Sequence, residues 1–274
     1  MLSLLNNIFG VNKPVRKGNT REYEQPATPR FKTLPLIYPE KRLCLFFSAK
    51  AGCTFATKWF FFHQGILEEA MEFSNWVHDY RIRVYYKQEK YREELNCVLA
   101  DDYTRIKLVR SPYQRAVSSY LHAIKTKYAD KLLAEFLDRE VNYENKFTFE
   151  EFVDFLQTED ISTCNPHHRM QIDPLELTEA LQFNKIIKLE ESFDGFNRIE
   201  KETGLEKTNM EKFSQSYHHT KKIDNKIYCG NVSFKTRDKK FGEYKNFYNQ
   251  SSKSIIRSIY AVDFESYDYS TENI

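Results

Sequence analysis

The chain has 274 residues with 41 basic and 39 acidic side chains, and its net charge of +2 excludes a strongly polycationic nucleic-acid-binding protein. Hydrophobic residues make up 41% and charged residues 29%, which excludes a disordered chain, and the length allows one large folded domain. No apolar run approaches the roughly 20 residues of a membrane-spanning helix, and the odd number of five cysteines favours free thiols in a reducing compartment. We therefore expect a cytoplasmic protein without a transmembrane segment.

The first 40 residues differ in composition from the rest. Five of the eight prolines lie at or before position 39, among polar residues. Proline fixes φ and lacks a backbone donor, so this composition is typical of an extended arm or linker. We predict an N-terminal arm over 1–40 and a single folded domain over 41–274.

A short apolar run followed by a helical pattern recurs three times in the folded part. The predicted strand and helix pairs are 42–47 with 54–63, 105–109 with 113–124, and 185–189 with about 192–203. Gly65 and Gly204 stand near the expected C-terminal ends of the first and third helices. Strand followed by helix, repeated, predicts an α/β fold with a parallel sheet flanked by helices.

Further helices are expected outside these three units. The sequence Thr-Phe-Glu-Glu at 148–151 is a capping box that opens a helix over 149–156, and Asp173 followed by Pro174 starts another. Residues 254–262 have helical periodicity. These segments predict helical rather than strand structure between and after the three units.

The loop after the first strand reads Ser-Ala-Lys-Ala-Gly-Cys-Thr at 48–54. In an open parallel sheet, ligands bind beyond the carboxyl ends of the strands, where helix N-termini favour anions. Gly52 allows close approach of the backbone, Lys50 adds a charge and Thr54 adds a hydroxyl donor. The loop differs from a Walker A motif, because the lysine precedes a single glycine, which weakens an ATPase or kinase interpretation.

A second candidate anion loop follows the second strand. Arg110 stands at the strand end, where its guanidinium can bind a phosphate with two hydrogen bonds. Ser118 comes eight positions later, on the predicted helix. Each loop alone could be an ordinary strand-to-helix turn, but the two together predict an anion-binding site.

These loops resemble those of the sulfotransferases that use 3′-phosphoadenosine 5′-phosphosulfate (PAPS). The stretch 46–54 is similar to the Pro-Lys-x-x-Cys-Thr loop of the chondroitin and HNK-1-type carbohydrate sulfotransferases. The stretch 110–120 is similar to their Arg-Asp/Asn-Pro-Phe-x-Arg-x-x-Ser-x-Tyr motif. Weaker similarity continues at 165–171, 183–191 and 259–267.

The resemblance implies a P-loop-like nucleotide-binding fold and a site for each end of the donor. It places Lys50, Ala51, Gly52, Cys53 and Thr54 around the 5′-phosphosulfate. One departure from the family pattern is Ser-Ala at 48–49 in place of a residue and proline, which changes loop stiffness.

The same resemblance places Arg110 and Ser118 on the 3′-phosphate of PAPS. A second departure from the family pattern is His168, which replaces a more usual ring pair and leaves the acceptor contacts open. The expected acceptor is a hydroxylated molecule, and the resemblance favours a glycan.

Catalysis by such a site follows from charge. Sulfuryl transfer leaves negative charge on the donor's phosphate oxygen, which Lys50 can stabilise. The acceptor hydroxyl also needs a general base, typically worth about 10²–10⁴-fold. The sequence offers one preferred base and four alternatives: His78, whose ordinary pKa suits the role, and Glu89, Glu93, His167 and His168.

Other functions are less consistent with these residues. Cys164, His167, His168, His218, His219 and Cys229 could in principle bind zinc, but no CxxC or HxxxH partner follows, so we predict no metal site. A P-loop kinase and a non-catalytic glycan-binding protein are the alternative functions. The kinase interpretation is weakened because the chain lacks a Walker A motif. A glycan-binding protein would leave the two anion loops unexplained.

Overall fold

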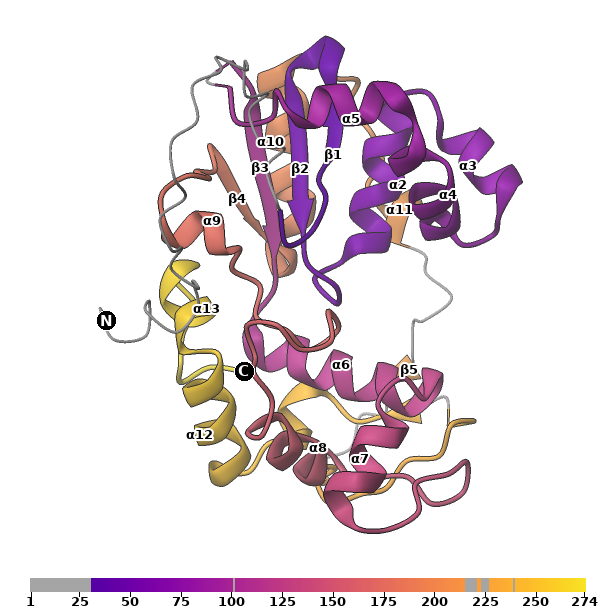
Figure 1. Ribbon diagram of the computed structural model, residues 1–274, viewed down its shortest axis with the longest axis vertical. Coiled ribbons are helices and arrows are strands. Elements are labelled where there is room, and N and C mark those ends of the chain that lie inside the picture. Colours follow the sequence, from indigo (N-terminus) through magenta and orange to yellow (C-terminus); the bar gives the residue numbers. More distant parts are fainter. Residues whose placement is uncertain (1–30, 101, 215–220, 223–226, 239) are drawn as a thin grey trace, which may run out of the picture.

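The computed structural model describes residues 31–100, 102–214, 221–222, 227–238 and 240–274. Its centre is a four-stranded sheet (Figure 1). In the order in which they pair, the strands are β1 (Leu36–Tyr38), β2 (Leu43–Phe47), β3 (Thr104–Val109) and β4 (Lys185–Lys188). The β2–β3 and β3–β4 pairs are parallel, while β1 is antiparallel to β2. The predicted α/β class with a mostly parallel sheet is confirmed.

The central strands are apolar because both faces of the sheet are covered. All five residues of β2 and the last four of β3 are buried. The strand β1 lies in the stretch for which we expected an extended arm, so the sheet includes residues N-terminal to residue 41. Residues 1–30 of that predicted arm lie outside the described part of the chain.

Each of the three predicted helices follows its strand as expected. They are α2 (Cys53–His63), α6 (Pro112–Thr126) and α10 (Ser192–Thr203). Gly204 ends α10 with a φ of 65°, a left-handed conformation that glycine adopts without a steric penalty. Pro112 occupies the first turn of α6, where its missing N–H costs no hydrogen bond.

Several helices were not predicted. They are α3 (Leu67–Phe73), α4 (Val77–Arg83), α5 (Glu89–Leu95), α7 (Asp130–Leu137) and the four-residue α11 (Glu211–Ser214). The first four have no side-chain hydrogen bond at the N-cap and at most eight residues each, so neither a cap nor a long period marks them in the sequence. Tertiary packing, rather than a local signal, stabilises these helices.

The expected capping box at 148–151 is present, and a second one is found where Asp173 was expected to start a helix. Thr148 caps α8 (Phe149–Leu156), and Asp173 caps the short α9 (Pro174–Leu177). The predicted C-terminal helix is divided in two, α12 (Gln250–Ile259) and α13 (Ala261–Ser266). Short 3₁₀ turns and a two-stranded pair complete the described elements: Pro39–Lys41, Tyr85–Lys87, Leu189–Glu191, Tyr244–Phe247, and β5 (Lys221–Lys222) with β6 (Lys240–Phe241).

Two large hydrophobic cores, and a small cluster of Val109, Ile172 and Tyr267, organise the described part of the molecule. The first joins the sheet to α2, α4, α5 and α10, and the second joins α6, α7, α8, α12 and α13 below the carboxyl ends of the strands (Figure 1). The β3–α6 connection passes from one core to the other, so the loops at the strand ends lie between them. No helix among the described residues is long and apolar enough to cross a membrane.

Candidate functional site

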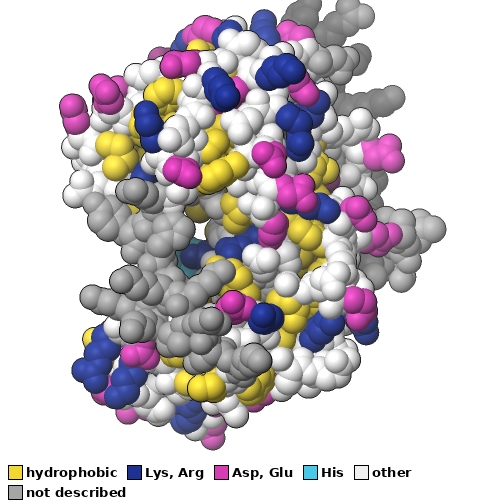
Figure 2. Space-filling view, turned by 180° about the vertical axis from the view of Figure 1, so that it is seen from behind, with side chains coloured by type: hydrophobic (Ala, Val, Ile, Leu, Met, Phe, Trp, Pro, Cys, Tyr) yellow, Lys and Arg dark blue, Asp and Glu magenta, His cyan; other side chains and the backbone are white. Residues whose placement is uncertain are grey.

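A cavity of about 360 Å³ lies where the two cores meet. Figure 2 shows Lys and Arg side chains and a histidine in a hollow between the two halves of the molecule. The residues that line the cavity are Lys50, Gly52, Cys53, Thr54, Phe55, Arg110, Ser118, Leu189, Ser192, Phe193, Phe213, Ser214 and Tyr244. The structure therefore brings both predicted anion loops to one cavity. Of the predicted donor-site residues, only Ala51 does not line the cavity, because its side chain is fully buried.

The first loop turns sharply before α2. Lys50 and Gly52 have φ values of 68° and 85°, in the left-handed region. A Cβ atom on Gly52 would lie 2.5 Å from Leu189 Cδ1, so the close approach of chain and neighbour also requires glycine. No side chain caps α2, and its first amides stand beside the cavity, where an anion can accept their hydrogen bonds.

Lys50 lies among other cations. Burial, and then the nearby charges of Arg110, Lys125 and Arg115, lower its pKa to about 8, although Cys53 acts in the opposite direction. A bound anion would offset that repulsion. The position therefore favours a phosphate or sulfate group next to the Lys50 ammonium.

Cys53 stands at the first position of α2. Burial alone would raise the pKa of its thiol, but His78, Arg81 and Lys50 outweigh this effect and lower the pKa to about 6. The charges of Arg81 and Lys50 that stabilise a thiolate here also suit an anionic ligand.

Arg110 reaches the first loop from the second one. Its Nη1 donates to the Lys50 carbonyl at 3.0 Å, and its guanidinium lies 5.0 Å from the centre of the Tyr244 ring. Its buried Nε has no hydrogen-bond partner among the described residues. Gln171 fixes the backbone here, accepting from Arg110 N at 2.9 Å and donating to Arg110 O at 2.8 Å. Ser118, two turns along α6, lines the same cavity.

His78 comes from α4 to the start of α2. Its Nε2 lies 3.0 Å from Thr54 Oγ1, and its Nδ1 is buried without a hydrogen-bond partner in the described structure. The side chain is only 4% exposed. The histidine thus stands beside the loop 48–54, although it is not one of the residues that line the cavity.

The alternative bases are placed differently. Glu89 and Glu93 are exposed on α5 and line a separate surface hollow. His168 is fully buried and faces Glu159. His167 is half-buried, and burial, followed by the charges of Lys50 and Arg115, lowers its pKa to about 4. Lys50 itself thus lies close enough to lower the pKa of His167.

Arg81 is a site residue that the sequence analysis missed. Its guanidinium lies 5.1 Å from the centre of the Phe47 ring and 5.7 Å from that of Tyr86. Its Nε and Nη1 are buried and have no hydrogen-bond partner among the described residues. Arg81 stands three positions after His78, so the helical i, i+3 spacing was the available signal, once α4 was recognised.

Arg115 is a second residue that the sequence analysis missed, and it binds the backbone of two separate segments. It is 2% exposed and donates to Ala49 O at 3.0 Å and to Arg169 O at 2.6 Å. It thereby connects α6 to the loop 48–54 and to the segment 165–171.

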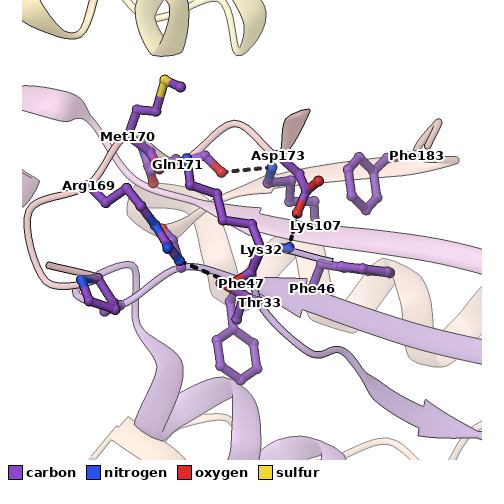
Figure 3. Close-up of a pocket in the computed structure, with 13 residues that line it drawn as sticks. Lys32, Thr33, Phe46, Phe47, Lys107, Arg169, Met170, Gln171, Asp173 and Phe183 are labelled. Atoms are coloured by element: carbon purple, nitrogen blue, oxygen red, sulfur yellow. Dashed lines mark hydrogen bonds between the residues drawn. The ribbon is translucent and has the colours of Figure 1, made fainter. Parts of the chain in front are cut away.

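The space behind that segment is closed (Figure 3). It measures about 20 Å³, with Lys32 running between Arg169 and Asp173. Lys107 on β3 donates to the Gln171 carbonyl at 3.1 Å and pairs with Glu176. These buried contacts hold the segment that carries Gln171, and they leave no room there for a nucleotide.

A model of the sulfotransferase family matches residues 36–270. Neither the curated proteins nor the solved structures include a significant match. The family match spans most of the 274 residues and contains both loops of the cavity. The chain therefore belongs to the sulfotransferase family, whose activity is sulfuryl transfer.

Proposed function

We propose that this enzyme takes the sulfuryl group from PAPS and transfers it to a hydroxyl of a carbohydrate. The observation that carries the proposal is the single cavity in which Lys50 and the open N-terminus of α2 face Arg110 and Ser118. A donor with a phosphosulfate at one end and a second phosphate at the other needs two such anion sites. Neither kinase motifs nor a flat glycan-binding surface accounts for that pairing.

The cavity also offers a place for the adenine of PAPS. Its apolar side contains Phe55, Phe193 and Phe213, and Phe55 stacks on Phe193 with ring centres 5.7 Å apart. The Phe193 side chain is 40% exposed, so a planar base can cover it. In this arrangement Arg110 and Ser118 bind the 3′-phosphate, while residues 50–54 bind the 5′-phosphosulfate.

The chemistry is an in-line displacement at sulfur. The acceptor oxygen forms the new S–O bond as the bond from sulfur to the 5′-phosphate oxygen breaks, and that oxygen leaves with the electron pair. The Lys50 ammonium and the first amides of α2 stabilise its charge. His78 accepts the acceptor's hydroxyl proton, and its contact with Thr54 Oγ1 keeps the ring beside the transferring group.

A carbohydrate acceptor is supported by the sequence resemblance to carbohydrate sulfotransferases. Arg81 adds a buried cation with two unused donors on the His78 side of the loop. A glycan with a carboxylate or an existing sulfate would satisfy these donors. A panel of acidic and neutral glycans with labelled donor tests this, and a preference for neutral glycans would contradict it.

The donor assignment is tested by calorimetry with 3′-phosphoadenosine 5′-phosphate and with AMP, which lacks the 3′-phosphate. The wild type should prefer the first nucleotide strongly. Arg110→Ala should lose most of that preference, by about 10–100-fold, since a buried charge-assisted contact is worth about 1.5–3 kcal/mol. Arg92→Ala, an exposed arginine on α5, is the matched control and should behave as wild type. An unchanged preference in Arg110→Ala would remove the donor assignment.

A further inference from the structure

Three chemically suited side chains meet away from the donor cavity, in the loop after α8. The groups that could ligate a metal on Glu159, Cys164 and His168 all lie within 4.8 Å of one another. His168 Nε2 and Glu159 Oε2 are 3.7 Å apart. In a tetrahedral zinc site with bonds of about 2.0–2.3 Å, ligand atoms are separated by roughly 3.3–3.8 Å, so small side-chain rotations complete the geometry.

A second observation points to a ligand. The His168 side chain is completely buried, yet its Nε2 has no hydrogen-bond partner among the described residues. A buried polar atom without a partner costs about 1–3 kcal/mol. The Nε2 atom faces the other two groups, so a metal ion placed between them would supply the missing partner.

Short-range backbone hydrogen bonds within the loop help to hold these groups together. The backbone closes on itself from Met170 N to Ile161 O at 2.9 Å, and Cys164 N donates to Asp160 O at 2.9 Å. The Asp160 carboxylate is already occupied by Ser162 and Thr163, so it is no competing ligand. The three groups are thus arranged by short-range hydrogen bonds before any ion binds.

The other nitrogen of His168 has the contact typical of a metal-bound histidine. Its Nδ1 lies 3.3 Å from Tyr128 Oη, which in turn lies 3.0 Å from Ser119 Oγ. In the tautomer with the proton on Nδ1, that proton is donated to Tyr128 and the lone pair of Nε2 points toward Glu159. Outer partners of this kind orient ligating imidazoles.

We propose that Glu159, Cys164 and His168 bind one Zn²⁺ ion, with a water molecule as the fourth ligand. A mixed set of thiolate, imidazole and carboxylate favours zinc over magnesium or calcium. Binding converts the Cys164 thiol to a thiolate and releases its proton to solvent. This proposal differs from our expectation of no metal site. Two of its ligands, Cys164 and His168, were among the residues first considered for zinc, and Glu159 takes the place of the others. His218 and His219 lie outside the described residues.

The function of this ion is structural. His168 is followed by Arg169 and Gln171, whose contacts with Arg115 and Arg110 position the donor loops. A metal on His168 would fix the start of that segment. Zinc binding by these three residues does not depend on the binding of a 3′-phosphate. The proposal therefore stands even if the donor is not PAPS.

The test uses the full-length protein, exchanged into metal-free buffer and then dialysed against limiting ZnCl₂. Elemental analysis should find one zinc per chain, and thermal melting should shift upward with zinc. Replacement by Co²⁺ should give a thiolate-to-metal charge-transfer band, because Cys164 is the only sulfur ligand of the site. Absence of bound zinc in the wild type overturns the proposal.

Variants separate this site from chance binding elsewhere. Cys164→Ser and Glu159→Gln change partly exposed groups and should fold, yet lose the bound zinc. Cys164→His should regain zinc but not the cobalt charge-transfer band. Cys97→Ser, at an exposed cysteine, is the matched control and should keep both. Equal zinc content in Cys164→Ser, Glu159→Gln and Cys97→Ser would place the metal elsewhere and refute the site.

Discussion

At the residue scale, several positive groups surround the short loop 48–54 beside the cavity. Arg110, Arg115 and Lys125 all act on Lys50, and their repulsion adds to the effect of burial on its pKa. Such an arrangement is costly without a ligand and favourable with a polyanion. In the proposed mechanism, the charge of Lys50 is therefore of most use when the leaving phosphate oxygen becomes fully negative.

For Lys50→Ala we expect a loss of about 10²–10³-fold in kcat, the range for removal of one group that stabilises a transition state. Donor affinity should fall far less, because other groups still bind the ground state. Lys50→Arg should rescue only in part, since a planar guanidinium cannot place its charge where a compact ammonium does. Single-turnover transfer at saturating donor measures the rate.

Thermal melting of the same variants separates catalysis from folding. A structural role for Lys50 would lower stability and preserve the rate per folded molecule. The pH profile adds a check, because the wild type should lose kcat/KM as pH rises above about 8, where free Lys50 loses its proton. If Lys50→Ala shows normal single-turnover rates, the mechanism is wrong even where PAPS still binds.

Cys53 offers a chemical probe of the same loop. Its pKa of about 6 predicts that alkylation by iodoacetamide rises with pH and is half-maximal near pH 6. Cys44, fully buried in β2, should not react, because burial raises the pKa of its thiol far above the neutral range. Bound 3′-phosphoadenosine 5′-phosphate should protect Cys53, as measured by mass spectrometry of peptides. Equal labelling with and without nucleotide would argue against a donor site at this loop.

At the element scale, the turn from β2 into α2 depends on Gly52. Its φ of 85° is unfavourable for any residue with a Cβ, and that Cβ would also contact Leu189. The resulting strain would displace the first amides of α2 from the cavity. The backbone conformation of Gly52 is therefore expected to determine how well the first amides of α2 can bind an anion.

We expect Gly52→Ala to cost about 1–3 kcal/mol in stability and to weaken nucleotide binding more than tenfold. Chemical denaturation and calorimetry measure the two effects. Gly65→Ala is the control, since Gly65 also has a positive φ of 71° but nothing lies within 4 Å of its added Cβ. It should lose stability and keep nucleotide affinity. Normal nucleotide affinity in Gly52→Ala would show that the turn does not shape the site.

At the scale of the whole molecule, the C-terminal helix α13 supports the Arg110 loop across the boundary of the two cores. Asp263 on α13 is fully buried and accepts hydrogen bonds from the backbone of Gln171 and Ile172 at 2.8–2.9 Å. The Gln171 side chain then holds the backbone of Arg110. The last part of the chain thus helps to determine where the Arg110 loop lies.

Asp263→Ala should lower the free energy of unfolding by about 2–4 kcal/mol, because two buried N–H groups lose their acceptor. Nucleotide affinity should fall as well, through displacement of Arg110. Asp263→Asn keeps one acceptor oxygen and should have intermediate effects. Glu265→Ala, exposed on the same helix, is the control for both measurements. Full nucleotide affinity in folded Asp263→Ala would disprove the coupling.

The sequence by itself determined the parts that local forces control. The three strand and helix pairs, the capping box at Thr148, the helix start at Asp173 and the end of α10 at Gly204 follow from periodicity and cap chemistry. The two anion loops were also recognisable, because each is a contiguous motif. The parallel order of β2, β3 and β4 then brought those loops to the same edge of the sheet.

Tertiary structure alone decided which distant side chains meet the loops. The contact of His78 with Thr54 spans 24 positions, and that of Gln171 with Arg110 spans 61. Neither sequence separation matches the period of a helix or strand, and α4 has no N-cap side chain by which it could be recognised in the sequence. The same holds for Arg81 and for the edge strand β1, whose three residues are too few to show alternation. Their positions follow from packing between elements, in which burial of apolar surface outweighs weak local preferences.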